Sequence, residues 1–244
     1  MLKCITGIIL SFFVAGSSAF AVDGNVLLEK VDRNLNPESF EMYRKLINME
    51  PDGSKKEYLM YSVKKGKDRI ASLYLSPASE KGRSTLRIGE NMWLYIPNVG
   101  RPIRITSMQS VTGGIFNNAD IMRLDYNEEY NCENVDRDED LYLLHLKANT
   151  RSVAYDRVKM WADQEKLLPI KIECYASSGM LLKTLYFREV KDFGGGIVRP
   201  AIIETDSPLH KGYMSIMLFA KIKVRVLKDE VFSLNFMPNL ESLR

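Results

Sequence analysis

The sequence predicts a mainly β protein in which an antiparallel sheet curls into an open or closed barrel. Beyond one short amphipathic segment near the start, apolar and polar residues alternate with period two, as they do in half-buried strands. Ten or more such segments are separated by turns rich in Gly, Ser, Lys and Asp. Because a flat sheet of that width is unusual, we expect the strands to curl on themselves.

The first element is expected to be a helix over 25–34. Leu27 and Val31 recur at helical spacing, Asn25 is a suitable N-cap, and Pro37 follows shortly after the end. These features predict one short amphipathic helix.

Strands are expected along most of the remaining chain. The clearest pair is a hairpin in which segments 58–63 and 70–75 flank a turn at 64–68. Further strands are expected over 40–46, 85–88, 91–97, 102–106, 141–148, 153–162, 170–175, 181–190, 198–205 and 213–226.

The segment 107–130 interrupts this alternation. Its apolar residues, Ile115 and Phe116 among them, lie between Gly, Asn and Asp without a regular period. We expect a loop with short helical turns that lies across the sheet. Since no linker, low-complexity tract or internal repeat is present, we treat residues 22–244 as one domain.

The first 21 residues are typical of a secretory signal peptide. Lys3 carries a positive charge, an apolar run covers 5–15, and Ala19-Phe20-Ala21 forms a small-residue cleavage site. The apolar run is short for a bilayer span, although a retained anchor is the alternative. We expect cleavage after Ala21, which removes Cys4 and leaves an exported, unlipidated chain.

Two cysteines, Cys132 and Cys174, remain after this cleavage. An oxidising compartment favours pairing, and a disulfide that closes this loop would stabilise the fold by roughly 4 kcal/mol on the chain-entropy model. The alternative is two unpaired cysteines, one in a loop and one in a strand. Both interpretations are compatible with the sequence.

The composition argues against nucleic-acid binding and against catalysis. The formal charge is +3, from 34 Lys and Arg against 31 Asp and Glu, which is too even for a protein that neutralises many phosphates. The sequence contains no G-x-S-x-G, H-E-x-x-H or Gly-rich phosphate loop, and His145 and His210 have no metal-ligand spacing. The acidic stretch 125–140 lacks the order of a calcium loop and is expected to be a solvated loop. We therefore expect no catalytic residue, metal site or cofactor.

Apolar residues are concentrated in two strands, 92–96 and 213–222. A strand that is apolar on both faces needs cover on both sides, unless one face lines an internal cavity. The 12 methionines would supply a pliable lining for an irregular apolar ligand.

Several segments carry a family resemblance. Residues 88–97, IGENMWLYIP, resemble the D-G-x-x-x-W-x-Y-x-P strand of outer-membrane lipoprotein-sorting proteins. Larger relatives of that carrier, described as lipoprotein-sorting protein-like, are similar at four further places in the same order: 27–32, 113–120, 158–171 and 179–184.

The resemblance implies an unclosed antiparallel β-barrel, or half-barrel, with a helical lid over an apolar cavity. It implies a monomeric, non-enzymatic carrier or chaperone in the periplasm of a Gram-negative bacterium. Such a carrier shields the acyl chains of a lipoprotein or lipid during transfer towards the outer membrane, because each exposed CH₂ costs about 0.8 kcal/mol in water. The arginine that ties the lid in the best-known carrier has no counterpart at 79–84, so no gating residue is carried over.

A second function fits the same scaffold. The chain could be a periplasmic sensor or an accessory binding module that reads lipids or lipoproteins for an inner-membrane or efflux-type transporter. Fold alone does not separate a sensor from a carrier.

The expected site lies between the tryptophan strand and the irregular segment. Because neighbouring residues of a strand point to opposite faces, Trp93 and Tyr95 share one face. We expect that face to look towards the lid, with Ile115 and Phe116 covering the opening. Trp161 is expected on the same wall.

Overall fold

The computed structural model of the chain describes residues 23–244. The expected signal peptide, its cleavage point after Ala21 and Cys4 lie outside the described residues. Within 23–244, none of the helices is long and apolar enough to cross a bilayer.

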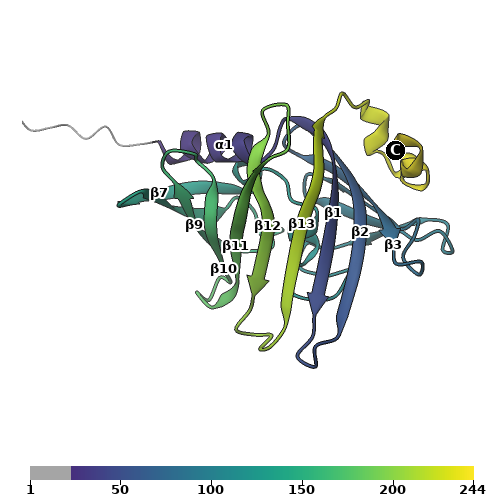
Figure 1. Cartoon of the computed structure of the whole chain (residues 1–244), viewed down its shortest axis with the longest axis horizontal. Coiled ribbons are helices and arrows are strands. Elements are labelled where there is room, and N and C mark those ends of the chain that lie inside the picture. The colour runs from purple at the N-terminus through teal and green to yellow at the C-terminus, as the bar shows by residue number, and fades with distance from the viewer. Residues whose placement is uncertain (1–22) are drawn as a thin grey trace, which may run out of the picture.

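Thirteen antiparallel strands form one curved sheet (Figure 1). The spatial order is β6-β5-β4-β3-β2-β1-β13-β12-β11-β10-β9-β8-β7, so two meanders are joined where β1 pairs with β13. The end strands β6 and β7 are not paired with each other, and the barrel is therefore unclosed. This confirms the predicted fold class. The strands are β1 Ser39–Met49, β2 Lys55–Lys65, β3 Arg69–Ser76, β4 Ser84–Ile88, β5 Asn91–Tyr95, β6 Pro102–Ile105, β7 Tyr130–Asp138, β8 Leu141–Ala148, β9 Arg157–Asp163, β10 Pro169–Tyr175, β11 Leu181–Asp192, β12 Val198–Asp206 and β13 Met214–Val224.

Strand β1 shows how the sequence pattern becomes a two-faced sheet. Phe40, Met42 and Leu46 are buried on one face, and Glu41 and Tyr43 on the other face are partly exposed. The alternation follows from the pleat, which turns successive side chains to opposite sides. The expected hairpin is confirmed as β2 and β3.

Helix α1, Gly24–Leu35, lies against the concave side of the sheet and packs on β7 and β12. Its buried stripe includes Leu28 and Val31. The helix was expected, but its predicted N-cap was wrong. Asp23 caps the helix by accepting hydrogen bonds from the backbone N–H groups of Asn25 and Val26. The helix begins at Gly24, two residues before the start that an N-cap at Asn25 implies.

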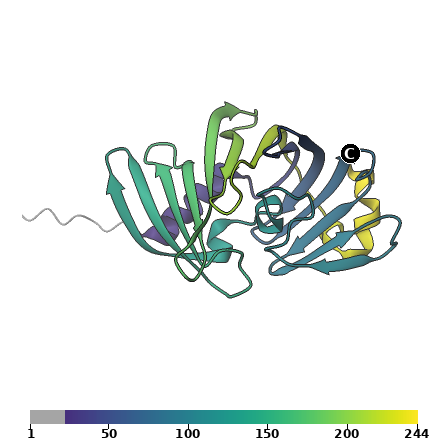
Figure 2. The same ribbon diagram turned by 90° about the horizontal axis from the view of Figure 1, so that it is seen from below.

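The irregular segment 106–129 crosses the concave side, as predicted. It contains two single-turn helices, α2 Asn118–Ile121 and α3 Tyr126–Glu129, and a capping box between Asn117 and Asp120 begins α2. Figure 2 shows this segment between the two halves of the curved sheet, with α1 against the half that contains β7 and β12. We call residues 106–129 the cover segment.

The acidic stretch expected to be a solvated loop is partly a strand. Residues 130–138 form the edge strand β7, which pairs with β8 on one side only. Most of its side chains are exposed, and a charged edge strand resists pairing with another chain. These residues have low intrinsic strand propensity, but hydrogen bonding to the neighbouring strand β8 holds them in a strand.

The C-terminal residues form two 3₁₀ helices, η1 Asp229–Phe232 and η2 Leu234–Leu243, that pack on β3 and β4 (Figure 1, yellow). Their side chains Phe232, Met237 and Leu240 build a second apolar core with Leu73 and Leu86 on the outer face of the sheet. The part of the sheet that contains β3 and β4 is therefore covered on its outer face as well as on its concave face.

Candidate functional site

A cavity of about 50 Å³ lies at the centre of the concave face. It is bounded by β1–β3 and β11–β13 on the sheet side, and by the end of α1 and the cover segment on the other side. Four phenylalanines form much of its wall: Phe40, Phe116, Phe187 and Phe219. Met42 and Met217 add flexible side chains to the lining.

The lining is mostly apolar, as expected, but it also contains charged side chains. Charged side chains reach it from the sheet and from the cover segment, namely Arg44, Lys64, Asp120, Arg123 and Arg199. The sheet contributes three of these cations because they occupy inward-facing positions on β1, β2 and β12. The cavity therefore combines apolar walls with a positively charged region.

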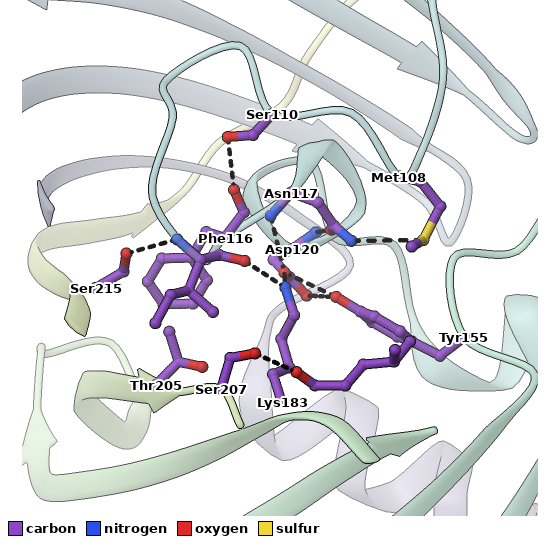
Figure 3. A network of polar contacts seen from close by, with 12 residues as sticks. Met108, Ser110, Phe116, Asn117, Asp120, Tyr155, Lys183, Thr205, Ser207 and Ser215 are labelled. Carbon is purple, nitrogen blue, oxygen red and sulfur yellow. Dashed lines mark hydrogen bonds and ion pairs between the residues drawn. The ribbon is translucent and has the colours of Figure 1, made fainter. Parts of the chain in front are cut away.

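A buried polar network ties the cover segment to the sheet (Figure 3). Lys183 on β11 donates to the Ile115 carbonyl oxygen at 2.5 Å and to Asp120 Oδ2 at 2.8 Å. The Tyr155 hydroxyl donates to both oxygens of Asp120 at 2.9 Å. Burial acts to raise the pKa of Asp120, but the positive charges of Lys183 and Arg123 hold that pKa below its ordinary value. Asp120 is therefore an ionised anchor.

A second set of hydrogen bonds holds the loop before α2. The Asn48 amide on β1 donates to the carbonyl oxygens of Thr112 and Gly113, both at 3.1 Å. Ser215 Oγ on β13 donates to Asn48 Oδ1 at 2.8 Å and accepts from the Ile115 N–H at 3.0 Å. These bonds bring the loop backbone close to the sheet over Asn48.

The remaining half of the cover segment is fixed to α1. Asp32 accepts hydrogen bonds from the backbone N–H groups of Tyr126 at 2.8 Å and Asn127 at 2.9 Å. Burial raises the pKa of Asp32 to about 6. Arg33 and Lys64 both donate to Asp125, which precedes α3. Helix α1 and the cover segment thus form one connected layer over the cavity.

Two of the residues predicted for the lid meet at this layer. Phe116 is 1% exposed and lines the cavity, and the neighbouring Ile115 is buried, with its backbone held by Lys183 and Ser215. Phe116 also belongs to the main apolar core. The segment is thus firmly packed, and Phe116→Asp would disturb the core as well as any ligand.

The structure places Trp93, Tyr95 and Trp161 away from the cavity. Trp93 and Tyr95 pack against the outer core built by the C-terminal helices, while their neighbour Met92 faces the concave side. Trp161 also alternates outward, and Lys171 Nζ lies 3.7 Å from the centre of its ring. The predicted grouping of Trp93 with Tyr95 holds, but the predicted face was wrong because η1 and η2 provide apolar cover outside the sheet.

Sequence analysis missed the inward-facing arginines. The run Phe40, Met42, Arg44, Leu46 places a charged residue at a position where the strand's period requires an inward side chain. A charged residue at an inward-facing position of an alternating strand could therefore have been recognised in the sequence as a candidate site residue. No comparable signal exists at Arg199, whose neighbours do not alternate.

Cys132 and Cys174 are both free, so of the two interpretations the disulfide is wrong and the cysteines are unpaired. The register follows one line across four strands. Cys132 on β7 pairs with Leu146 on β8, Leu146 pairs with Val158 on β9, and Val158 pairs with Cys174 on β10. Three interstrand steps of about 4.8 Å separate the two residues, whereas a disulfide needs Cα atoms within about 7 Å. Both cysteines lie in strands, which differs from the alternative of one loop cysteine.

These features define a class of half-barrel β proteins whose concave face is covered by a helix and an irregular segment. A family model described only as "Uncharacterized protein" matches residues 66–239. No curated protein matches the chain in a sequence comparison.

Solved structures identify the family. A LolA superfamily protein from Nitrosomonas europaea is 30% identical, with a TM-score of 0.80, and the match covers 88% of this chain and 100% of that one. The chain belongs to the LolA superfamily, which confirms the resemblance found in the sequence.

Two more distant structures share the fold. One is a domain from Vibrio parahaemolyticus assigned to outer membrane lipoprotein sorting, at 19% identity and a TM-score of 0.75, covering 88% of this chain and 98% of that one. The other is a DUF1329 family protein from Desulfovibrio piger, at 19% identity and a TM-score of 0.74, covering 88% and 97%.

Proposed function

We propose that this protein is a non-enzymatic periplasmic carrier that shields the acyl chains of a lipoprotein or lipid during transfer towards the outer membrane. The observation that carries the proposal is the covered cavity with phenylalanine walls at the centre of the concave face. Membership of the LolA superfamily and the similarity to a lipoprotein-sorting domain support it.

The size of the cavity implies that cargo entry requires movement. Its volume of about 50 Å³ holds a few water molecules, whereas pockets for drug-sized ligands measure roughly 300–1,000 Å³. Met42 and Met217 can change rotamer at low cost. Displacement of the cover segment would open the remaining space, because its core residue Phe116 lies directly on the cavity.

Mass spectrometry of organic extracts tests the proposal. Protein purified from the periplasm should carry acyl lipid or lipopeptide, and should transfer it to acceptor liposomes. Retention of cargo in the presence of acceptor liposomes would favour the sensor function. Protein that is consistently empty and that fails to bind acyl probes would contradict acyl binding altogether.

Two neighbouring residues on β12 offer a matched pair of variants. Ile203 lines the cavity, whereas Ile202 points to the other face of the strand. Ile203→Trp should fill the space and abolish recovery of cargo, and Ile202→Trp should leave it unchanged. Equal cargo in both variants would exclude this cavity as the acyl site.

The proposal also covers the export of the protein, its oligomeric state and its partner. We expect export across the inner membrane, cleavage after Ala21 and a monomer in solution, with an inner-membrane transporter as a candidate partner. Intact mass, size-exclusion chromatography with light scattering, and co-purification after crosslinking measure these three properties.

A further inference from the structure

The buried cations of the concave side fall into two groups. Lys64, Arg87 and Lys183 each form an ion pair with a buried carboxylate, at 2.5, 2.5 and 2.8 Å respectively. Arg44 and Arg199 are equally buried, at 2% and 3% exposure, and neither forms an ion pair with any of the described residues. Two buried cationic side chains therefore have no anionic partner among residues 23–244.

Arg44 projects from β1 into the cavity at a β-bulge between Tyr43 and Arg44. Bulges are common next to functional sites because they re-aim a side chain. Its guanidinium donates to Ser72 Oγ at 3.1 Å and to Met217 Sδ at 3.7 Å, and its Nε–H has no partner. Much of the donor capacity of this guanidinium remains unused.

Arg199 reaches the same cavity from β12. It donates to the Leu35 carbonyl oxygen at 2.8 Å and to Asn36 Oδ1 at 2.5 Å, and its guanidinium lies 4.2 Å from the centre of the Phe219 ring. Phe219 is the cross-strand partner of Arg44. The two arginines thus approach one phenylalanine from different strands.

Arg44 and Arg199 are both positively charged and repel each other. Burial lowers the pKa of Arg44 to about 10, and burial together with the charge of Arg44 lowers the pKa of Arg199 to about 9. Both remain protonated at neutral pH. Burying an unpaired cation is strongly unfavourable, and apolar residues of similar volume would fill this space without that cost. Asp120, the carboxylate in the lining, is occupied by Lys183, Arg123 and Tyr155.

We propose that Arg44 and Arg199 bind the anionic headgroup of the acyl lipid, a carboxylate or a phosphate. This inference rests on the proposed function and adds the substrate class to it. Guanidinium groups bind the oxygens of carboxylate and phosphate through paired N–H donors. The phenylalanine and methionine walls beside them receive the chain, so headgroup and chain are recognised in one cavity.

Titration calorimetry of the full chain with three probes tests the inference: sodium decanoate, 1-decanol and inorganic phosphate. Wild-type protein should bind decanoate at least tenfold more tightly than decanol. Arg44→Gln and Arg199→Gln should each weaken decanoate binding at least tenfold and change decanol binding less than twofold. Arg188→Gln, which removes an exposed arginine of β11, is the matched control and should bind as the wild type does.

Folding of the variants is checked separately. Arg44→Met removes the charge and keeps a flexible apolar side chain, so it should be at least as stable as the wild type without ligand, and decanoate should no longer raise its melting temperature. A folded Arg44→Met that decanoate still stabilises as it does the wild type would overturn the inference.

The other outcomes are decisive in different ways. If decanoate and decanol bind equally tightly, and both affinities are unchanged in Arg44→Gln and Arg199→Gln, the headgroup site is overturned, whereas the proposed acyl-carrier function still stands. Binding of phosphate alone, lost in the variants, shows a free-anion site and overturns the lipid inference. Binding of none of the probes overturns the headgroup inference and the proposed function together.

Discussion

Gly114→Ala tests how tightly the cover segment is held to the sheet. Gly114 has φ +72° and Gly113 has φ +71°, so both occupy the left-handed region that disfavours side chains. A Cβ added at Gly114 would overlap the Asn48 amide and lie 2.7 Å from Ser215 Oγ, whereas a Cβ at Gly113 meets nothing within 4 Å. Gly113→Ala is therefore a matched control for the backbone conformation alone.

The expected cost follows from these contacts. An alanine in the left-handed region costs about 1–2 kcal/mol, and this is the whole effect expected for Gly113→Ala. Gly114→Ala also displaces Asn48, which makes hydrogen bonds to Thr112, Gly113 and Ser215. At about 1 kcal/mol each, their loss brings the total to about 4–5 kcal/mol.

Urea unfolding followed by circular dichroism measures both variants. We expect equal m-values and a free energy of unfolding about 3 kcal/mol lower for Gly114→Ala than for Gly113→Ala, three hydrogen bonds of about 1 kcal/mol each. Two variants that agree within about 0.5 kcal/mol, the usual range for substitutions without such contacts, would refute the close packing of this loop on Asn48.

Three further predictions concern buried groups. Asp120→Asn leaves Lys183 without its anion and should lower the free energy of unfolding by about 3–5 kcal/mol at pH 7. Because the pKa of Asp120 is held low, this difference should vanish as the pH falls through that lowered pKa, and a difference that persists in strong acid would contradict the assignment. For Asp32 the pH dependence of stability has the opposite sign. Its pKa is raised to about 6 in the folded state, so its contribution to the free energy of unfolding is fully present below about pH 4 and is lost as the pH rises through 6. Relative to Asp32→Asn, the wild type should lose on the order of 3 kcal/mol between pH 4 and pH 7 in urea titrations, and a difference that does not change with pH would exclude the raised pKa. Thiol labelling of native protein should modify Cys132 and spare Cys174, which is 1% exposed and has its pKa raised by burial to about 12. Mass mapping that links the two cysteines would contradict the strand order.

The strand pattern and the ordered motifs were sufficient to predict the family and the unclosed sheet. Alternation is a local property, because the pleat turns each residue of a strand away from its neighbour whatever lies around it. Local patterns predicted the hairpin of β2 and β3 from its alternation, the helix α1 from its helical spacing and the irregular cover segment from its lack of a period. The strand β7 could not be predicted in this way, since its Asn, Glu and Asp residues pair only because β8 lies beside them.

Periodicity groups the residues of a strand without showing which group faces inward. Trp93 and Tyr95 were placed together by the sequence, but the C-terminal helices, more than 130 residues later, supply the apolar cover that draws them to the outer face. Burial of apolar area favours either side that offers cover. The choice between the two faces therefore depends on the tertiary structure.

The sequence by itself determined most of the strands, the family and the position of Phe116 in the irregular segment that covers the concave face. Only the tertiary structure decided that Arg44 and Arg199, 155 positions apart, share one cavity and that Cys132 and Cys174 do not meet. The physical reason is the range of the interactions. Backbone geometry sets the local pattern within a few residues, whereas strand order and curvature arise from burial summed over the whole chain and bring distant side chains together or keep them apart.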